Sequence, residues 1–167
     1  ITVLQVNDSP QITRYNGPGS IAEDSDITFS VSYFVISDPD GLDQTFSISV
    51  FDGDNYTLNS SGDGLVPDLN YNGTLFVGVV AKDQDGASSD IYQVELSVTA
   101  VNDLPTVKDL AIDPAVPTID NDLSVSFMAE DIDGDNVTAS IVWYKNGTVE
   151  SSQTNATVPA SATLCDE

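Results

Sequence analysis

The sequence alternates apolar and polar residues along Val94-Glu95-Leu96-Ser97-Val98 and then continues into Val101-Asn102-Asp103-Leu104-Pro105. Alternation with a period of two is typical of a β-strand that buries one face. Residues 27–33, 46–50 and 123–127 alternate in the same way, and residues 75–81 form a more continuous apolar run that is typical of a central strand. Because turn-forming residues separate these segments, the sequence predicts an all-β fold of tandem β-sandwiches.

The motif that follows residue 98 occurs twice. Val6-Asn7-Asp8-Ser9-Pro10 matches Val101-Asn102-Asp103-Leu104-Pro105, and the difference between positions 6 and 101 is 95 residues. An alternating segment and then an aspartate-rich loop follow each copy, at residues 38–41 and 131–135. A repeat of this length indicates tandem domains rather than a solenoid. We therefore expect the last strand of a preceding repeat plus a linker at residues 1–8, a complete sandwich at 9–103 and a partial sandwich at 104–167.

The second sandwich is expected to lack strands. Alternating segments predict strands near residues 107–112, 123–129, 137–145 and 149–158, and an incomplete sandwich exposes its apolar inner face and a free strand edge. We expect either the chain beyond residue 167 or an identical subunit to cover that face. In the second case residues 1–6 would be donated as an added strand. The expected partners are therefore neighbouring repeats or identical subunits.

Strand directions predict where the acidic loops meet. A first strand leads away from Asn7 and Asp8, and the next strand returns the chain, so residues 38–40 reach the same end of the sandwich; the turn after residues 75–81 points there too. Carboxylate, amide and carbonyl oxygens without nitrogen or sulfur match the ligands of Ca²⁺. The predicted calcium ligands are Asn7, Asp8, Asp38, Asp40, Asp83 and Asp85 in a first cluster, and Glu23, Asn102, Asp103, Asp131, Asp133 and Asp135 in a second cluster.

The charge of the chain favours a cationic ligand. Twenty-seven acidic and four basic residues give a formal net charge of -23, which repels nucleic acid and anionic membranes. No apolar run is long enough to span a bilayer, so membrane insertion is not expected. The alternative interpretation is a generally acidic surface, and the clustering of the carboxylates argues against it.

The residue types disfavour catalysis. The chain has no histidine, and Cys165 is its only cysteine, which removes the commonest general base and the Ser-His and Cys-His nucleophile pairs. Carboxylates two positions apart on one turn, such as Asp38 and Asp40, cannot flank a glycosidic bond. We therefore expect no enzymatic activity. Cys165 is expected to be free or to pair with a cysteine outside this segment, and we favour the pairing.

Asn-X-Ser/Thr triplets indicate an extracellular location. They exceed the number expected by chance and begin at Asn7, Asn55, Asn59, Asn72, Asn136, Asn146 and Asn155, with Asn7 the weakest because Pro10 follows its triplet. For Asn72 and Asn146 the Asn-Gly-Thr sequence is equally consistent with a simple turn. The expected glycosylation sites are Asn55, Asn59, Asn72, Asn136, Asn146 and Asn155, on a cell surface or a secreted filament.

Several of these motifs together carry a family resemblance. The chain has, in order, Glu23-Asp24, Asp38-Pro39-Asp40-Gly41, Asn70-Tyr71-Asn72-Gly73-Thr74, Asp83-Gln84-Asp85-Gly86 and residues 98–105. This order resembles the cadherin-like tandem repeats of microbial surface proteins and adhesins. The resemblance implies that Glu23, Asn102, Asp103, Asp131 and Asp133 share interdomain Ca²⁺. Residues 131–135 with Trp143-Tyr144-Lys145-Asn146-Gly147 and residues 158–162 resemble Ig-like or PKD-like repeats.

Three functions are consistent with these features. The repeats and open ends favour a structural unit of a calcium-rigidified surface stalk or filament. An adhesin module that binds a glycan or another cell would need an exposed aromatic patch, and an accessory domain of a secreted hydrolase would need a catalytic domain elsewhere. Trp143 is expected to pack in a core strand rather than to stack on carbohydrate.

Overall fold

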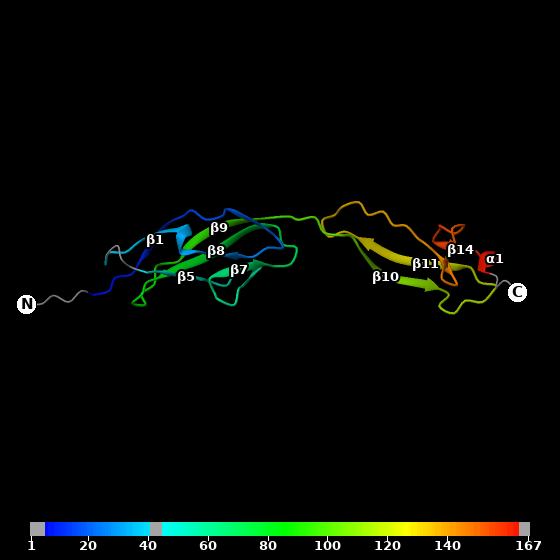
Figure 1. Ribbon diagram of the computed structural model, residues 1–167, viewed down its shortest axis with the longest axis horizontal. Coiled ribbons are helices and arrows are strands. Elements are labelled where there is room, and N and C mark those ends of the chain that lie inside the picture. The colour runs from blue at the N-terminus through cyan, green and yellow to red at the C-terminus, as the bar shows by residue number, and fades with distance from the viewer. Residues whose placement is uncertain (1–5, 41–44, 164–167) are drawn as a thin grey trace, which may run out of the picture. The chain divides into compact units, whose positions relative to one another are not determined.

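A computed structural model describes residues 6–40 and 45–163 of the chain (Figure 1). The chain divides into two compact units, Ile1–Val101 and Asn102–Glu167. The expected strand of a preceding repeat falls mostly on residues 1–5, and Cys165 also lies outside the described residues. Among the helices in the described ranges, none is long and apolar enough to cross a membrane.

The larger sheet of the first unit contains four strands in the order β2, β9, β8 and β5. Their bounds are Ser20–Ala22 for β2, Ser47–Val50 for β5, Gly73–Lys82 for β8 and Tyr92–Thr99 for β9. β9 pairs parallel with β2 and antiparallel with β8, which pairs antiparallel with β5. The prediction that residues 75–81 form a central strand is confirmed, because β8 lies between β9 and β5 (Figure 1).

The other strands of this unit form two smaller sheets. β1 (Gln11–Tyr15) pairs antiparallel with β4 (Phe34–Ser37), while β7 (Gly64–Pro67) lies between β3 (Ile27–Thr28) and β6 (Tyr56–Leu58). One hydrophobic core joins these strands to the larger sheet. It contains Ile12, Ile27, Phe29, Phe34, Tyr56 and Leu65 from the smaller sheets and their connections, and Ile48, Val50, Leu75, Val77, Val79, Ala81, Val94, Leu96 and Val98 from the larger sheet. The alternating apolar side chains of β8 and β9 thus face the core, as expected for a sandwich.

The prediction of one continuous strand at residues 27–33 is wrong. After β3 the chain makes a short 3₁₀ turn, η1 (Val31–Tyr33), whose N-cap Ser30 accepts a hydrogen bond from the backbone N–H of Ser32 at 3.3 Å. The physical reason is the odd spacing of two core residues, because residues an odd number of positions apart point to opposite faces of a strand. Phe29 and Phe34 would point to opposite faces of a continuous strand, whereas the turn lets both rings enter the core with centroids 6.2 Å apart.

An aromatic cluster closes this part of the core. The Tyr15 ring lies 5.1 Å from Phe34 and 6.0 Å from Phe29, measured between ring centroids, and its hydroxyl donates to the Pro18 carbonyl at 2.9 Å. Burial, followed by the neighbouring Tyr33, raises the pKa of Tyr15 to about 12. The turn that carries Pro18 depends on Gly17, because a Cβ there would lie 2.5 Å from the Tyr15 hydroxyl oxygen.

The second unit contains a three-stranded sheet and a separate hairpin. The sheet has the order β10 (Thr106–Asp113), β11 (Leu123–Glu130) and β14 (Thr157–Val158). The hairpin pairs β12 (Tyr144–Lys145) with β13 (Thr148–Val149), and α1 (Ala160–Thr163) follows β14. The predictions of strands near 107–112 and 123–129 are confirmed.

The predicted strands at 137–145 and 149–158 are largely wrong. Only short pieces of these ranges pair, namely β12, β13 and β14. A strand needs a partner to satisfy its backbone groups, and in the described part of this unit β10 and β14 already occupy the two edges of β11. Residues 137–143 pair with none of the described strands, although β10 and β14 are edge strands.

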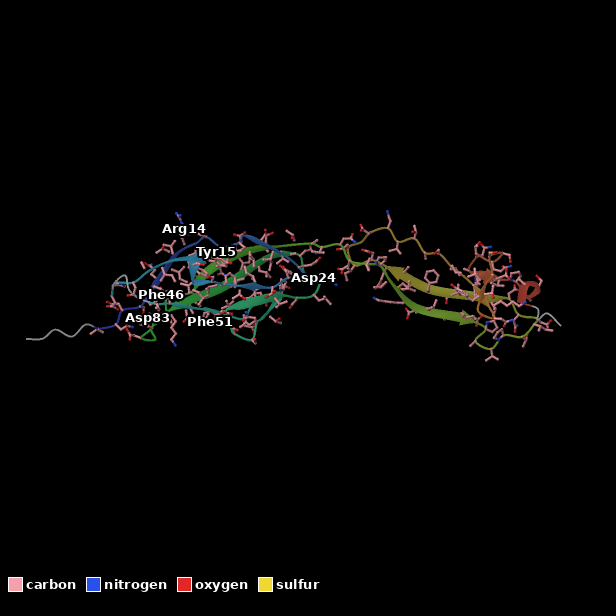
Figure 2. The ribbon with its side chains drawn as sticks, in the orientation of Figure 1. Arg14, Tyr15, Asp24, Phe46, Phe51 and Asp83 are labelled. Carbon is pink, nitrogen blue, oxygen red and sulfur yellow. The ribbon has the colours of Figure 1, made fainter. Side chains whose placement is uncertain are left out.

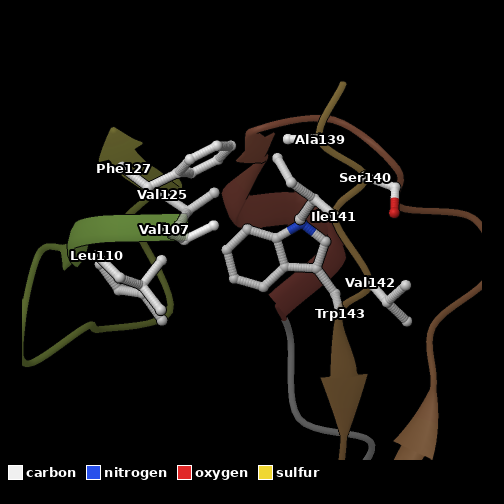
Figure 3. A pocket seen from close by; sticks show the side chains of 10 residues that line it. Val107, Leu110, Val125, Phe127, Ala139, Ser140, Ile141, Val142 and Trp143 are labelled. Carbon is white, nitrogen blue, oxygen red and sulfur yellow. The ribbon is translucent and has the colours of Figure 1, made fainter. Parts of the chain in front are cut away.

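The sheet of the second unit has a bare inner face. Val158 is its only buried hydrophobic side chain among residues 102–162. Val107 and Leu110 of β10 and Phe127 of β11 line an apolar hollow of about 300 Å³, across which they face Trp143 (Figure 3). Trp143 is half-buried, and its Nε1 donates to the Asn155 carbonyl at 2.9 Å. It thus faces the inner face across this hollow, from a position just before β12 rather than from the predicted central strand.

Candidate functional site

Asp83 organises the turn that follows β8. Its Oδ1 accepts hydrogen bonds from the backbone N–H groups of Asp85, Gly86 and Ala87 at 3.0, 2.6 and 2.8 Å, and its Oδ2 accepts from Asn7 Nδ2 at 3.0 Å. The side chain is 5% exposed. Burial pushes its pKa upward, but the donors from Asn7 and the turn outweigh it and hold the pKa below its ordinary value. Asp83 is therefore an ionised hub that ties Asn7 to the turn.

A second pair of acidic residues continues this cluster. The backbone N–H of Asp8 donates to Asp40 Oδ2 at 2.6 Å, and the N–H of Asp40 donates to Asp38 Oδ1 at 2.8 Å. Asp38 Oδ2 is buried and has no hydrogen-bond partner in the described part of the chain. One carboxylate oxygen of Asp38 thus remains available to a ligand.

The structure brings most of the first predicted cluster to one end of the first unit. Antiparallel pairing of Gln11 with Ser37 returns the chain beside its start, and Asp83 lies at this end, opposite Asp24 (Figure 2). We define the upper cluster as Asn7, Asp8, Asp38, Asp40 and Asp83. Asp85 differs from its neighbours, because its side chain is exposed and it joins the cluster through its backbone N–H, which donates to Asp83.

Glu23 lies at the other end of the first unit, directly after β2. The carboxylate is almost fully buried, with 2% of the residue exposed, and its Oε1 accepts the backbone N–H of Val101 at 2.6 Å. The Glu23 backbone N–H donates to the Thr99 carbonyl at 3.0 Å, which extends the β2–β9 pairing. Glu23 Oε2 is buried without a hydrogen-bond partner among the described residues. A buried carboxylate with a bare oxygen thus sits against the last residue of this unit.

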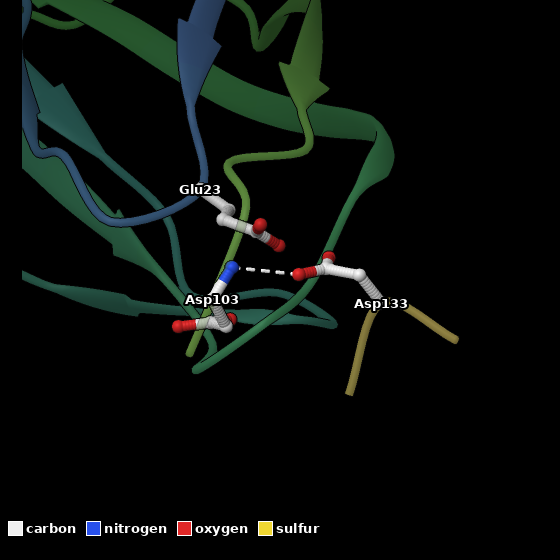
Figure 4. Close-up of side chains that lie close together, drawn as sticks. All are labelled: Glu23, Asp103 and Asp133. Carbon is white, nitrogen blue, oxygen red and sulfur yellow. Dashed lines mark hydrogen bonds between the residues drawn. The ribbon is translucent and has the colours of Figure 1, made fainter. Parts of the chain in front are cut away.

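The predicted ligands of the second unit repeat the hydrogen bonds that join Asp8, Asp40 and Asp38 in the upper cluster. The N–H of Asp103 donates to Asp133 Oδ2 at 2.7 Å, which Figure 4 marks with a dashed line, and the N–H of Asp133 donates to Asp131 Oδ1 at 2.9 Å. Asp135 is exposed, and its N–H donates to the same Asp131 oxygen at 3.4 Å. Asn102 Nδ2 donates to the Asp103 carbonyl at 2.8 Å. The motif that repeats in the sequence therefore also repeats as hydrogen bonds.

The predicted glycosylation sites differ in their geometry. Asn59 is engaged inside a turn, because its Nδ2 donates to Asp63 Oδ1 at 3.0 Å and its Oδ1 accepts the Gly62 N–H at 2.8 Å. A glycan on Asn59 Nδ2 would have to break this arrangement. Exposed residues occupy the other predicted sites, at Asn55, Asn72, Asn136, Asn146 and Asn155.

An apolar patch that the sequence did not predict lies on the outer face of the larger sheet. Phe76 of β8 is 63% exposed, Ile91 is 63% exposed and Phe51 is 46% exposed. A Cβ built on Gly78 would lie 3.2 Å from the Ile91 side chain and 3.6 Å from that of Phe51, so these side chains flank one glycine. The available signal was the parity of Phe76, which alternates with the buried Leu75 and Val77. We call Phe51, Phe76 and Ile91 the outer patch.

Comparisons with known proteins add little beyond the fold. No family model matches the chain, and no curated protein matches it. The crystal structure of the N-terminal eight Ig domains of Down Syndrome Cell Adhesion Molecule aligns at 14% identity and a TM-score of 0.34, over 92% of this chain and 24% of that one. The D00-D0 domain of intimin aligns at 15% identity and a TM-score of 0.30, over 74% of this chain and 65% of that one. The chain spans less than two thirds of either structure, and its all-β sandwich class rests on the strands described above.

Proposed function

We propose that this chain is an extracellular structural repeat in which Ca²⁺ binds at the ends of a β-sandwich and stiffens a surface stalk or filament. One observation carries the proposal. Each end of the first unit holds a buried carboxylate oxygen without a hydrogen-bond partner in the described ranges, Asp38 Oδ2 at one end and Glu23 Oε2 at the other. Burying an unpaired polar atom is unfavourable, so folding alone would not favour these oxygens. A bound cation would supply the partner that they lack.

The donor set supports calcium rather than a softer metal. The ligands near Asp38 are carboxylate and amide oxygens, and the chain offers no histidine. Ca²⁺ takes six to eight oxygens in flexible geometry, whereas Mg²⁺ requires a near-ideal octahedron. In the upper cluster Asp8, Asp38, Asp40 and the Asn7 Oδ1 would hold the ion. Asp83 would keep the cluster in shape, since both of its oxygens already accept hydrogen bonds.

In the proposed mechanism, Ca²⁺ would stiffen the linker by binding residues on either side of it. Glu23 is tied to Val101, and Asp133 is tied to Asp103, two residues further along the chain. An ion held by Glu23, Asn102, Asp103, Asp131 and Asp133 would restrict the backbone between these two anchors. The net charge of -23 supplies the repulsion that the ion would cancel. Each bound Ca²⁺ would also stabilise the folded units by mass action.

Calorimetric titration with CaCl₂ tests this function. We expect saturable binding in the wild type. In Glu23→Gln the site that uses Glu23 is expected to weaken at least about tenfold, because a buried carboxylate ligand is lost, while binding at the upper cluster is unchanged. Asp24→Asn is the matched control, since Asp24 is the exposed neighbour and its substitution removes the same charge. Equal loss of affinity in both variants would show that only net charge matters, and heats too small to fit in the wild type would contradict calcium binding altogether.

The adhesin alternative has one observation in its favour. An adhesive module would need an exposed aromatic surface, and the outer patch supplies two phenylalanine rings and an isoleucine. No comparable observation favours an accessory domain of a hydrolase. The identity of whatever covers the outer patch therefore decides between a structural and an adhesive role.

A further inference from the structure

The outer patch has polar neighbours on the adjacent strand of the larger sheet. In β9 the outward residues beside the patch are Gln93 and Glu95, which pair with Gly78 and Phe76 across the ladder. Phe51 lies beside the same glycine, since its N–H donates to the Gly78 carbonyl at 2.9 Å. The Phe51 and Ile91 side chains both lie close to this glycine. An exposed apolar surface with a polar border suits the ring of a neutral sugar.

A glycosylation triplet begins directly before the strand that carries Phe76. Alternation points Leu75 and Val77 into the core, and the half-buried Tyr71 packs against that core as well. The Tyr71 hydroxyl donates to the Thr74 carbonyl at 3.0 Å, which fixes the start of β8. Thr74 and Phe76 therefore lie on the outer face of β8, and the exposed Asn72 directly precedes the strand. Four residues of chain place Asn72 within about 14 Å of Phe76, a distance that a short chain of sugar rings spans.

Charge limits what else can cover the patch. At a net charge of -23, a second copy of the chain and any acidic partner are repelled. A neutral glycan meets no such barrier, and one attached at Asn72 is present at high effective concentration. We propose that Asn72 carries an N-linked glycan whose first sugars lie over Phe76 and the outer patch. This inference rests on the extracellular part of the proposed function and is independent of its calcium part.

The attachment step is ordinary N-glycosylation. A bond forms between Asn72 Nδ2 and the anomeric carbon of the first sugar, and the bond from that carbon to the phosphate of an activated sugar-phosphate donor breaks. The phosphate leaves with the electron pair, and the amide nitrogen loses a proton. Asn72 suits this step because it is exposed and has no side-chain hydrogen bond among those recorded in the described residues, in contrast to Asn59.

A double-mutant cycle tests the proposal in the chain secreted from a host that attaches N-glycans. Peptide mapping by mass spectrometry is expected to show sugar at Asn72. Asn72→Gln is expected to lower the thermal midpoint of the first unit by about 4 °C, because the sugar contacts with the rings are lost. In a Phe76→Ser background the same substitution is expected to cause almost no shift. Asn136→Gln, which removes an exposed triplet in the second unit, is the matched control and is expected to leave the first unit unchanged.

Dye binding provides a second measurement that does not depend on the stability of the variants. We expect Asn72→Gln to raise the fluorescence of a dye that binds exposed apolar surface, and Phe76→Ser to abolish the rise. An unoccupied Asn72 would overturn the proposal. Equal midpoint shifts with and without Phe76 would also overturn it, because the glycan would then act without contacting the patch. Neither result bears on the calcium titration, so the two proposals fail separately.

Discussion

Asp133 Oδ2 accepts the backbone N–H of Asp103 at 2.7 Å. The corresponding residues of the first unit, Asp40 and Asp8, make the same bond at 2.6 Å. In both places the Asp-X-Asp loop holds the linker residue through one oxygen of its second aspartate. Two loops that share little else in sequence thus hold the residue before them in the repeated motif by the same hydrogen bond.

Asp83→Asn is expected to destabilise the first unit. The substitution replaces an ionised acceptor of four hydrogen bonds by a neutral amide that cannot accept all of them. We expect the thermal midpoint to fall by about 5 °C, whereas Asp85→Asn, at an exposed side chain on the same turn, changes it by about 1 °C. Circular dichroism in buffer without calcium measures both. Equal midpoints for the two variants would contradict the role of Asp83 as a hub.

Asp83 also predicts how stability depends on pH. Its folded pKa lies below the ordinary value of 3.8, so the ionised form is favoured by folding. The contribution is therefore present above pH about 4 and is lost as pH falls through the folded pKa. Urea unfolding between pH 5 and pH 2, at about half-unit steps, is expected to show a smaller loss of stability in Asp83→Asn than in the wild type. An identical slope in both proteins would exclude Asp83 as a contributor.

The strand directions could be predicted from the sequence, while the break within residues 27–37 could not. Parity alone placed Asn7, Asp38 and Asp83 at one end, and the pairing of β1 with β4 has that result. The η1 turn depends on two phenylalanines at positions of opposite parity both entering one core. Only tertiary packing decides that, and local alternation favoured a continuous strand.

Gly17→Ala is expected to weaken the aromatic cluster. The new Cβ would lie 2.5 Å from the Tyr15 hydroxyl oxygen, so the ring must move and its hydrogen bond to Pro18 is lost. Gly19→Ala is the matched control, because nothing lies within 4 Å of its Cβ. We expect a loss of about 1–3 kcal/mol for Gly17→Ala and less than about 0.5 kcal/mol for Gly19→Ala in urea unfolding. The reverse order would show that the ring does not occupy this position.

The two units are expected to differ in local stability. β8 and β9 carry the buried side chains Leu75, Val77, Val94 and Leu96, whereas β10 and β11 carry no fully buried side chain in the described residues. We expect backbone amides of β10 to exchange with deuterium faster than those of β8 by on the order of a hundredfold or more. Mass spectrometry of the exchanged peptides measures this. Equal protection would mean that something covers the inner face of the second unit in solution.

The candidate ligands could be predicted from the sequence better than their individual roles. Spacing identified the Asp-X-Asp loops, but it could not distinguish Asp83 from Asp38. Both oxygens of Asp83 accept hydrogen bonds, whereas Asp38 Oδ2 has no hydrogen-bond partner in the described residues. The outer patch was missed because no local motif marks it. It exists because Phe51, directly after β5, and Ile91, directly before β9, both lie close to Gly78 in the folded unit.

The central claim is that calcium stiffens the chain. Small-angle X-ray scattering of the same sample in CaCl₂ and after addition of a chelator tests it most directly. We expect a larger and more sharply defined maximum dimension with calcium, and a smaller, broader distribution of distances once the carboxylates near Glu23 and Asp133 lose the ion. Glu23→Gln in CaCl₂ is expected to resemble the chelated wild type. A maximum dimension that does not change on chelation would contradict the claim.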